Sequence, residues 1–186
     1  MALQLQLFAP SYGHLGAYTA TLRTGWSPYA ARDVSAEHRA AIEADPDAFL
    51  VDLVDLEKIG GSIVEPEGST RPKLPQIIRW MWDGDFVGVI NLRWQPGTDE
   101  LPPYVSGQIG YINVPRKRGK GYATEALRLM LPEARQLGLG HVELTTDPSN
   151  TASQKVIQQC DGRLAFTRDD MFSGAPKLHF RIELAS

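Results

Sequence analysis

The sequence has few of the features expected of secreted, metal-stabilised or membrane-spanning chains. Cys160 is the single cysteine among 186 residues, so no internal disulfide can form, and no Cys/His cluster has the spacing of a zinc site. No apolar run reaches about 18 residues, and the amino-terminal stretch lacks the basic leader of a signal peptide. An isoelectric point near 5.8 argues against a broad basic face for nucleic acid. We therefore expect a cytoplasmic protein that binds no metal, membrane or nucleic acid.

The composition that is present suits a globular chain. Hydrophobic residues make up 42% and charged residues 22%, which allows a core without disulfides or a structural metal. Charge is divided unevenly: residues 1–70 carry four Lys/Arg against ten Asp/Glu, whereas residues 71–186 carry fifteen against twelve. The length suits a single domain over residues 1–186, with a helical region over 1–75 and a sheet-rich region over 76–186.

Local patterns predict the order of the elements. Apolar residues at helical spacing predict helices over 10–23 and 35–56, with Ser35 as an N-cap and a division at Pro46. The Gly- and Pro-rich stretch 60–75 is predicted to be a loop. A hairpin is predicted over 76–94, with Asp83-Gly84-Asp85 as its turn. Further strands are predicted over 107–114, 141–146, 163–168 and 177–184, with helices after 121 and 150.

A tight turn between a strand and a helix carries the most informative chemistry. Gly119 and Gly121 lie among four cations and come immediately before the long helix. The first N–H groups of a helix have no intrahelical partner and lie at the positive end of its dipole. Without side chains at the two glycines, a phosphate can reach these amides, so the turn predicts a pyrophosphate site. The alternative is a solvated basic loop. No P-loop pattern occurs, and a dinucleotide fingerprint would need glycine at Thr124.

The same turn satisfies a known signature. Residues 116–121, RKRGKG, match Q/R-x-x-G-x-G/A, with a strand before, then a helix, a strand and Asn150 at the start of a second helix. The segment resembles the GNAT family of N-acetyltransferases, most closely a bacterial branch with GHIGY, RGKGYATE and D.N.AS.KVI, which appear here as GQIGY, RGKGYATE and residues 147–157. The resemblance implies a single-domain α/β (α+β) fold: a mixed, mostly antiparallel sheet with a splayed central strand pair and helices on both faces.

The resemblance also implies an activity and its partners. Acetyl-CoA would be the co-substrate, with no metal, and its acetyl group would pass directly to a primary amine in a ternary complex. The acceptor would be a small molecule or a peptide, recognised by the helical region over 1–75, and a homodimer is left open. Two alternatives remain: a catalytically silent acyl-CoA-binding regulatory module, and an N-acyltransferase that uses a longer acyl-CoA.

The resemblance assigns site residues by position. The strand backbone at Ile112, Asn113 and Val114 would pair with the pantetheine arm, and the N–H of Val114 would polarise the thioester carbonyl. The second helix would hold the arm through Asn150 and Ser153, although Asn150 also suits a plain helix cap. Amides that would bind the pyrophosphate belong to Arg118, Gly119, Lys120, Gly121, Ala123 and Thr124.

Two departures from the family pattern bear on catalysis. Ile157 stands where many members have a tyrosine general acid, and Gln108 stands where the resembled branch prefers histidine. The remaining candidates for proton transfer are Tyr111, Asp147 and His14. Each also has a structural interpretation: a packed strand aromatic, a turn residue and a surface residue.

The sequence also holds a lone thiol and several tryptophans that could be mistaken for site residues. Cys160 has no histidine at a recognisable spacing, so we expect a small buried residue rather than a nucleophile. The tryptophans could line an acceptor pocket, but we expect most of them in the core of the hairpin: Trp26, Trp80, Trp82 and Trp94.

Overall fold

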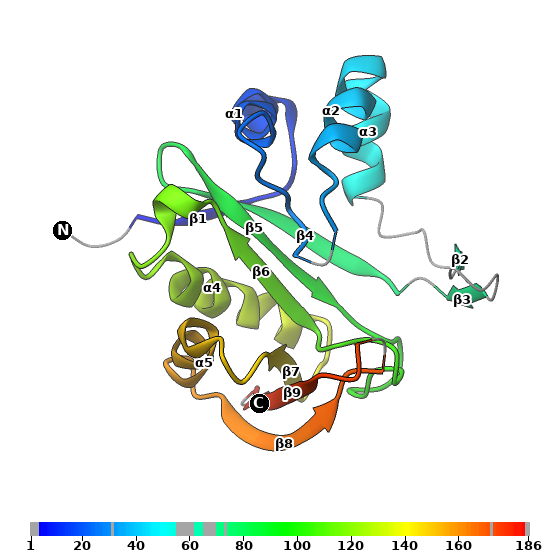
Figure 1. Ribbon diagram of the computed structural model, residues 1–186, viewed down its shortest axis with the longest axis vertical. Helices are drawn as coiled ribbons and strands as arrows, with labels where there is room; N and C mark the ends of the chain where they lie inside the picture. Colours follow the sequence, from blue (N-terminus) through cyan, green and yellow to red (C-terminus); the bar gives the residue numbers. More distant parts are fainter. Residues whose placement is uncertain are drawn as a thin grey trace.

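Two antiparallel sheets form the centre of the structure, a computed structural model that describes residues 4–30, 32–54, 62–64, 70–72, 74–171 and 173–184 (Figure 1). The first sheet has the order β1-β4-β5-β6, and the second has the order β7-β9-β8. A separate short hairpin joins β2 to β3. The strands are β1 (Gln6–Phe8), β2 (Ser62–Val64), β3 (Thr70–Pro72), β4 (Gln76–Trp82), β5 (Phe86–Arg93), β6 (Ile109–Asn113), β7 (His141–Thr146), β8 (Arg163–Asp169) and β9 (Pro176–Glu183).

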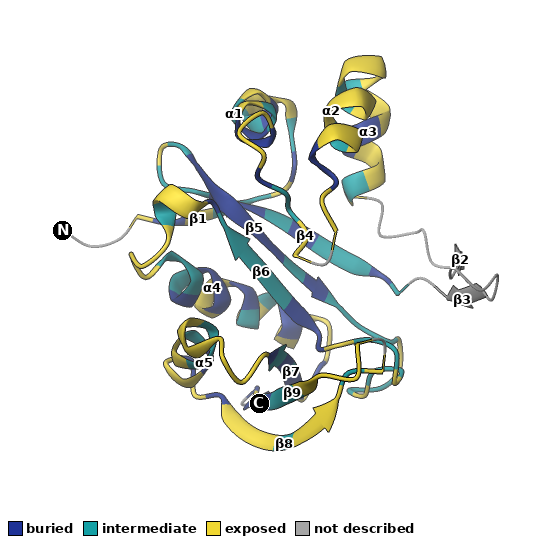
Figure 2. Ribbon diagram, viewed as in Figure 1, coloured by how far each residue is buried: buried dark blue, intermediate teal, exposed yellow. Residues whose placement is uncertain are grey.

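Helices cover both faces of the first sheet. On one face lie α1 (Tyr12–Leu22), α2 (Ser35–Ala44) and α3 (Pro46–Val54), and on the other lie α4 (Tyr122–Gln136) and α5 (Thr151–Gln158) (Figure 1). Each layer has its own buried apolar cluster, and Figure 2 shows the buried positions along β5 and on the inner side of α4. The predicted α/β fold, mostly antiparallel with helices on both faces, is confirmed.

The two sheets meet at Gln108, just before β6. Its backbone N–H donates to the Glu143 carbonyl at 2.7 Å, and its side-chain Oε1 accepts from the Glu143 N–H at 2.5 Å. Its Nε2 donates to the Asp99 carbonyl at 2.7 Å, so both ends of the amide are used. Beyond this junction, no ladder joins β6 to β7 in the part of the chain described. These two strands are the splayed central pair.

The structure tests the helix and loop predicted over residues 35–75. The region 35–56 does divide at Pro46, which begins α3 because proline suits the first turn of a helix. Ser35 was predicted as an N-cap, and this is wrong: Val34 occupies the cap position, and the Asp33 carboxylate accepts the Ser35 N–H at 2.8 Å. The predicted loop 60–75 contains β2 and β3, while residues 60, 61, 65–69 and 73 lie outside the described residues.

Aromatic packing fixes α1 to the first sheet. Tyr18 stacks on Trp80 with ring centroids 4.6 Å apart, and both side chains are almost fully buried. Trp26 is buried in the same layer, Trp82 packs against it, and Trp94 packs against the opposite cluster. The expectation that most tryptophans belong to the core is confirmed. Among the described helices, none is both long and apolar enough to cross a membrane.

Candidate functional site

The turn between β6 and α4 has an open backbone. A short 3-10 turn (Pro115–Lys117) leads into Gly119 and Gly121, whose φ angles of 71° and 83° lie in the left-handed region that favours glycine. A Cβ built at either glycine meets no atom within 4 Å. Gly121 is the N-cap of α4, a helix of 15 residues, so the positive end of its dipole lies at this turn.

The turn presents backbone N–H groups that the protein itself does not use. The first helical bond runs from the Glu125 N–H to the Gly121 carbonyl, and the N–H groups of residues 119–124 have no acceptor among the described residues. We call these N–H groups the glycine cradle. Arg118 was predicted to contribute its amide as well, which is wrong: this N–H donates to the Pro115 carbonyl at 3.2 Å. The cradle is therefore a concave set of donors suited to an anion.

Two of the four cations around the cradle are held by the turn of the β4–β5 hairpin. Arg116 pairs with Asp85 at 2.9 Å, and Lys117 pairs with Asp83 at 2.7 Å. The Tyr122 hydroxyl also donates to Asp83, so the hairpin turn anchors both ends of the cradle. Burial acts to raise the pKa of Asp83, but hydrogen bonds from Lys117 and Tyr122 outweigh it, and the pKa is lowered.

The other two cations belong to the cradle itself. Arg118 donates from Nε to the Asn113 carbonyl at 3.2 Å, and the exposed Lys120 has no carboxylate partner among the described residues. Sequence reasoning placed Asp83 and Asp85 only as turn residues. The available signal for an anchoring role was that two carboxylates flank Gly84 in the same sequence in which residues 116–120 carry four cations.

The outer edge of β6 pairs with no other strand among the described residues, although the Asn113 carbonyl on that edge accepts from Arg118. The Val114 N–H donates to the Val87 carbonyl at 2.8 Å, and the ladder to β5 continues through Ile112 opposite Val89. Because N–H groups alternate between the two edges of a strand, those of Tyr111 and Asn113 face away from β5. Val114 was predicted to polarise the thioester carbonyl through its N–H, which is wrong because β5 already accepts this hydrogen bond.

The start of α5 lies beyond β7. The Asn150 side chain accepts the Ser153 N–H at 3.1 Å, so its interpretation as a helix cap is confirmed. Ser153 itself is half-buried on the first turn of α5. In Figure 1, α5 lies beside α4.

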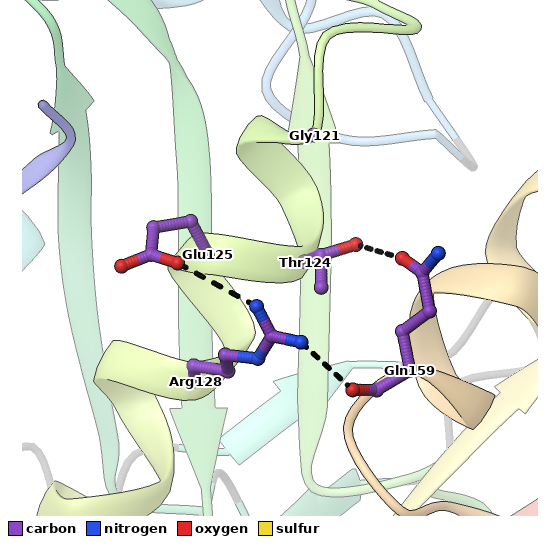
Figure 3. Close-up of a pocket in the computed structure, with 5 residues that line it drawn as sticks. All are labelled: Gly121, Thr124, Glu125, Arg128 and Gln159. Atoms are coloured by element: carbon purple, nitrogen blue, oxygen red, sulfur yellow. Dashed lines mark hydrogen bonds and ion pairs between the residues drawn. The ribbon is translucent and has the colours of Figure 1, made fainter. Parts of the chain in front are cut away.

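A shallow cavity of about 400 Å³, open to solvent, lies beside the cradle, between the first turns of α4 and the end of α5 (Figure 3). Its lining includes Gly121 and Thr124 from α4, together with Gln159. Thr124 Oγ1 donates to Gln159 Oε1 at 3.0 Å, and Arg128 donates to the Gln159 carbonyl at 3.1 Å. The cradle and this cavity are continuous through Gly121 and Thr124, so an anion on the cradle could carry a larger attached group into the cavity.

Comparison with known proteins decides the family. Residues 67–163, more than half of the chain, match the family described as "Acetyltransferase (GNAT) domain". The chain belongs to the GNAT acetyltransferase family. It is accordingly an acyltransferase. A search of the curated proteins finds no match to the sequence.

Solved GNAT structures share the fold at low sequence identity. The structure of Mycobacterium smegmatis RimJ in complex with CoA-disulfide superposes with a TM-score of 0.67 at 19% identity, covering 96% of this chain and 81% of that one. A Salmonella typhimurium acetyltransferase that modifies the N-terminal serine of ribosomal protein L7/L12 gives 0.63 at 13% identity, with 99% and 97% covered. YncA, a putative acetyltransferase from Salmonella typhimurium with its cofactor acetyl-CoA, gives 0.57 at 14%, with 98% and 95% covered.

In this GNAT chain, the two departures from the family pattern point into the interior. Ile157 is 1% exposed and packs in the core under α4, and Gln108 is also 1% exposed at the junction of the sheets. Neither position faces an open site. A histidine at position 108 would therefore sit in the same buried junction, out of reach of an acceptor.

The candidates for proton transfer lie in three different environments. Burial raises the pKa of Tyr111, and Ser153 lowers it in part. Among the described residues, no hydrogen bond of ordinary geometry reaches the buried hydroxyl. Asp147 follows β7 and pairs with Lys177 at 2.5 Å. His14 stacks on Phe8, with ring centroids 4.5 Å apart, at the opposite edge of the sheet from β6. The structure therefore brings Tyr111 to the open strand edge and keeps His14 away from it.

Proposed function

We propose that this chain binds acetyl-CoA and transfers its acetyl group directly to a primary amine. The observation that carries the proposal is the glycine cradle: the N–H groups of residues 119–124, unpaired within the described chain, at the positive end of α4. A diphosphate would accept several of these hydrogen bonds at once, and charge-assisted bonds of this kind are stronger than neutral ones. Arg118 and Lys120 would add attraction from the cradle itself.

The pantetheine arm would continue from the cradle along the open edge of β6. The N–H groups of Tyr111 and Asn113 face that edge, so the amide groups of the arm can pair with them as an added strand would. Residues Ile112 and Val114 would contribute apolar surface rather than this hydrogen bonding, because their backbone groups face β5. Asn150 and Ser153 on α5 would border the arm from the other side.

Transfer would take place where β6 and β7 separate. The Asn113 N–H, in place of that of Val114, would donate to the developing oxyanion, and a donor of this kind contributes about 3–4 kcal/mol when preorganised. Tyr111 has an ordinary tyrosine pKa of about 10, which burial raises further, so its hydroxyl carries a proton at neutral pH that it would donate to the leaving thiolate. Among the three candidates for proton transfer, Asp147 would remove the amine proton.

Three observations support direct transfer to an amine. Cys160 is 4% exposed, and burial raises the pKa of its thiol, so it is a poor candidate for an acyl-enzyme intermediate. The acceptor would bind on the side of α1 to α3, where the acidic balance of residues 1–70 attracts a cationic amine. Action of the Salmonella protein on an N-terminal serine supports a peptide amine as one acceptor class.

Thermal denaturation with acetyl-CoA, ATP and NAD in parallel tests the proposal. A ligand at 100 times its Kd adds about 2.7 kcal/mol to the free energy of unfolding. For a chain of this size, that corresponds to a rise in Tm of roughly 5–10 °C. We expect the rise with acetyl-CoA. A rise with ATP or NAD but none with acetyl-CoA would refute the assignment.

A matched pair of variants locates the binding to the cradle. Gly121→Asp places a carboxylate among the cradle N–H groups, so the acetyl-CoA shift should disappear. Gly138→Asp makes the same change at the other end of α4, where φ is 82° and a Cβ likewise meets no atom within 4 Å. Both variants carry the same left-handed strain, but only the first should lose the ligand shift. Equal loss of the acetyl-CoA shift in both variants would contradict binding at the glycine cradle.

A further inference from the structure

Arg93, at the end of β5, differs from the other half-buried arginines of the described chain. Arg79 binds Glu133 through two hydrogen bonds of 3.0 and 2.7 Å, and Arg181 pairs with Glu143 at 2.9 Å. Arg93 has no carboxylate partner among the described residues, and its Nε, like that of Arg181, is buried without an acceptor. Burying a guanidinium without an anion lowers the stability of the folded protein, so an arginine in this state is a candidate for a functional site.

The surroundings hold Arg93 in place without neutralising it. With the Asn91 amide oriented to satisfy both its ends, Oδ1 accepts from Arg93 at 3.1 Å and the amide nitrogen donates to the Gly110 carbonyl at 2.9 Å. In this orientation, a Cβ at Gly110 would meet the Asn91 amide nitrogen at 2.9 Å and a guanidinium nitrogen of Arg93 at 3.6 Å. The absence of a side chain at Gly110 therefore gives the Asn91–Arg93 pair room to lie over β6.

Two neighbours of Arg93 line a small recess on the face of the first sheet that α1 to α3 cover. They are Gln76, the cross-strand partner of Arg93, and Asn91, two residues before it; the recess of about 20 Å³ is also lined by Tyr29 and His38. Burial raises the pKa of Tyr29, and Arg93 lowers it in part, so the two side chains are electrostatically coupled. Arg93 thus lies on the face covered by α1 to α3, opposite the side of the cradle.

We propose that Arg93 binds a carboxylate of the acceptor, and that the acceptor therefore carries an acidic group as well as its amine. The inference rests on the proposed acetyl transfer at the β6 edge. A guanidinium fits a carboxylate with two parallel hydrogen bonds, and the unused Arg93 donors can supply them. The acidic helices would attract the amine end of the same molecule.

The position of Arg93 also sets the length of the acceptor. The guanidinium lies beside Gly110, whereas transfer is proposed at Asn113, three residues along β6. At the rise of an extended strand, these points are about 10 Å apart. The amine and the carboxylate must therefore be separated by several bonds, as in lysine or a short peptide, and not by the single carbon of an α-amino group beside its own carboxylate.

Paired acceptors test the proposal directly. Lysine, diglycine and triglycine would each be compared with their carboxamide forms, following release of the CoA thiol. We expect kcat/KM to favour the carboxylate forms by about tenfold to a hundredfold, the range of charge-assisted hydrogen bonds. Arg93→Gln should abolish the preference, and Arg93→Lys should restore part of it. Arg79→Gln, on the neighbouring strand, should leave the preference intact.

Binding measurements separate this inference from the function on which it rests. Calorimetric titration of the acetyl-CoA-loaded protein with the same pairs reports affinity without turnover. If acetyl-CoA stabilises the wild type and Arg93→Gln equally, but neither titration nor turnover distinguishes carboxylate from carboxamide, the carboxylate site is overturned and the transferase assignment stands. If acetyl-CoA fails to bind the wild type, the proposed function itself is wrong.

Discussion

Replacing Gln108 with leucine tests the junction that gives the site its shape. The side chain is 1% exposed, and it satisfies the Glu143 N–H at 2.5 Å and the Asp99 carbonyl at 2.7 Å. Leucine has a similar volume but neither polar group, so both partners would lose a hydrogen bond. Each unsatisfied buried group costs about 1–3 kcal/mol. Because Asp99 is only half-buried, water can reach its carbonyl in part, and we expect a total of about 2–4 kcal/mol.

The expected loss is measurable by thermal and urea denaturation. It corresponds to a fall in Tm of about 4–16 °C for a chain of this size. Hydrogen exchange at Glu143 should also speed up, because its amide lies at the junction. Gln108→His keeps one donor and one acceptor, so it should recover much of the stability without raising kcat. A Gln108→Leu variant as stable as the wild type would show that other contacts hold the two sheets together.

Two further predictions concern the anchors of the cradle and the arm. Asp83→Asn should weaken acetyl-CoA binding, because Lys117 and Tyr122 would lose the carboxylate that holds them. Since the pKa of Asp83 is lowered in the folded protein, its stabilising contribution is present above about pH 4 and is lost as the pH falls further. The free energy of unfolding in urea should therefore depend less on acid pH in the variant than in the wild type. Asn150→Asp keeps the oxygen that caps the Ser153 N–H and should retain the wild-type Tm, whereas Asn150→Ala should lower the free energy of unfolding by about 1 kcal/mol. Equal acetyl-CoA affinity in the wild type and both variants would show that Asn150 acts only as a helix cap.

The sequence predicted the central part of the fold because local signals there are strong and agree with one another. The long stretch after Gly121 has both helical periodicity and a glycine N-cap, and the hairpin over 76–94 has a clear turn. The short strands β1, β2 and β3 are different, since each has three residues, too few for alternation to show. Tertiary pairing, such as β1 with β4, decides their conformation.

In the candidate site, too, features set by the local backbone could be predicted, whereas features set by tertiary contacts could not. The glycines of the cradle could be recognised from spacing, because their role depends on the local backbone. The role of Val114 could not, since the edge toward which a strand N–H points depends on which neighbour pairs with it. The anchoring of Lys117 by Asp83 and the isolation of Arg93 depend on residues brought together from distant parts of the chain. Such contacts leave no periodic pattern in the sequence.

Ile157 cannot donate a proton, although many members of the family have a tyrosine at this position. Tyr111 is the side chain that can take over this role. Ile157 packs so closely that a Cβ at Gly162 would lie 2.3 Å from its methyl group, so a tyrosine there would overpack the core. Tyr111 instead places its buried hydroxyl on the α5 side of β6. Tyr111→Phe should lower kcat by about 10²-fold or more and leave the acetyl-CoA shift in Tm unchanged. Tyr12→Phe, the same change at an exposed residue of α1, is the control. An unchanged kcat in Tyr111→Phe would mean that the thiolate, whose conjugate acid has a pKa of about 8.5, leaves without help from the enzyme.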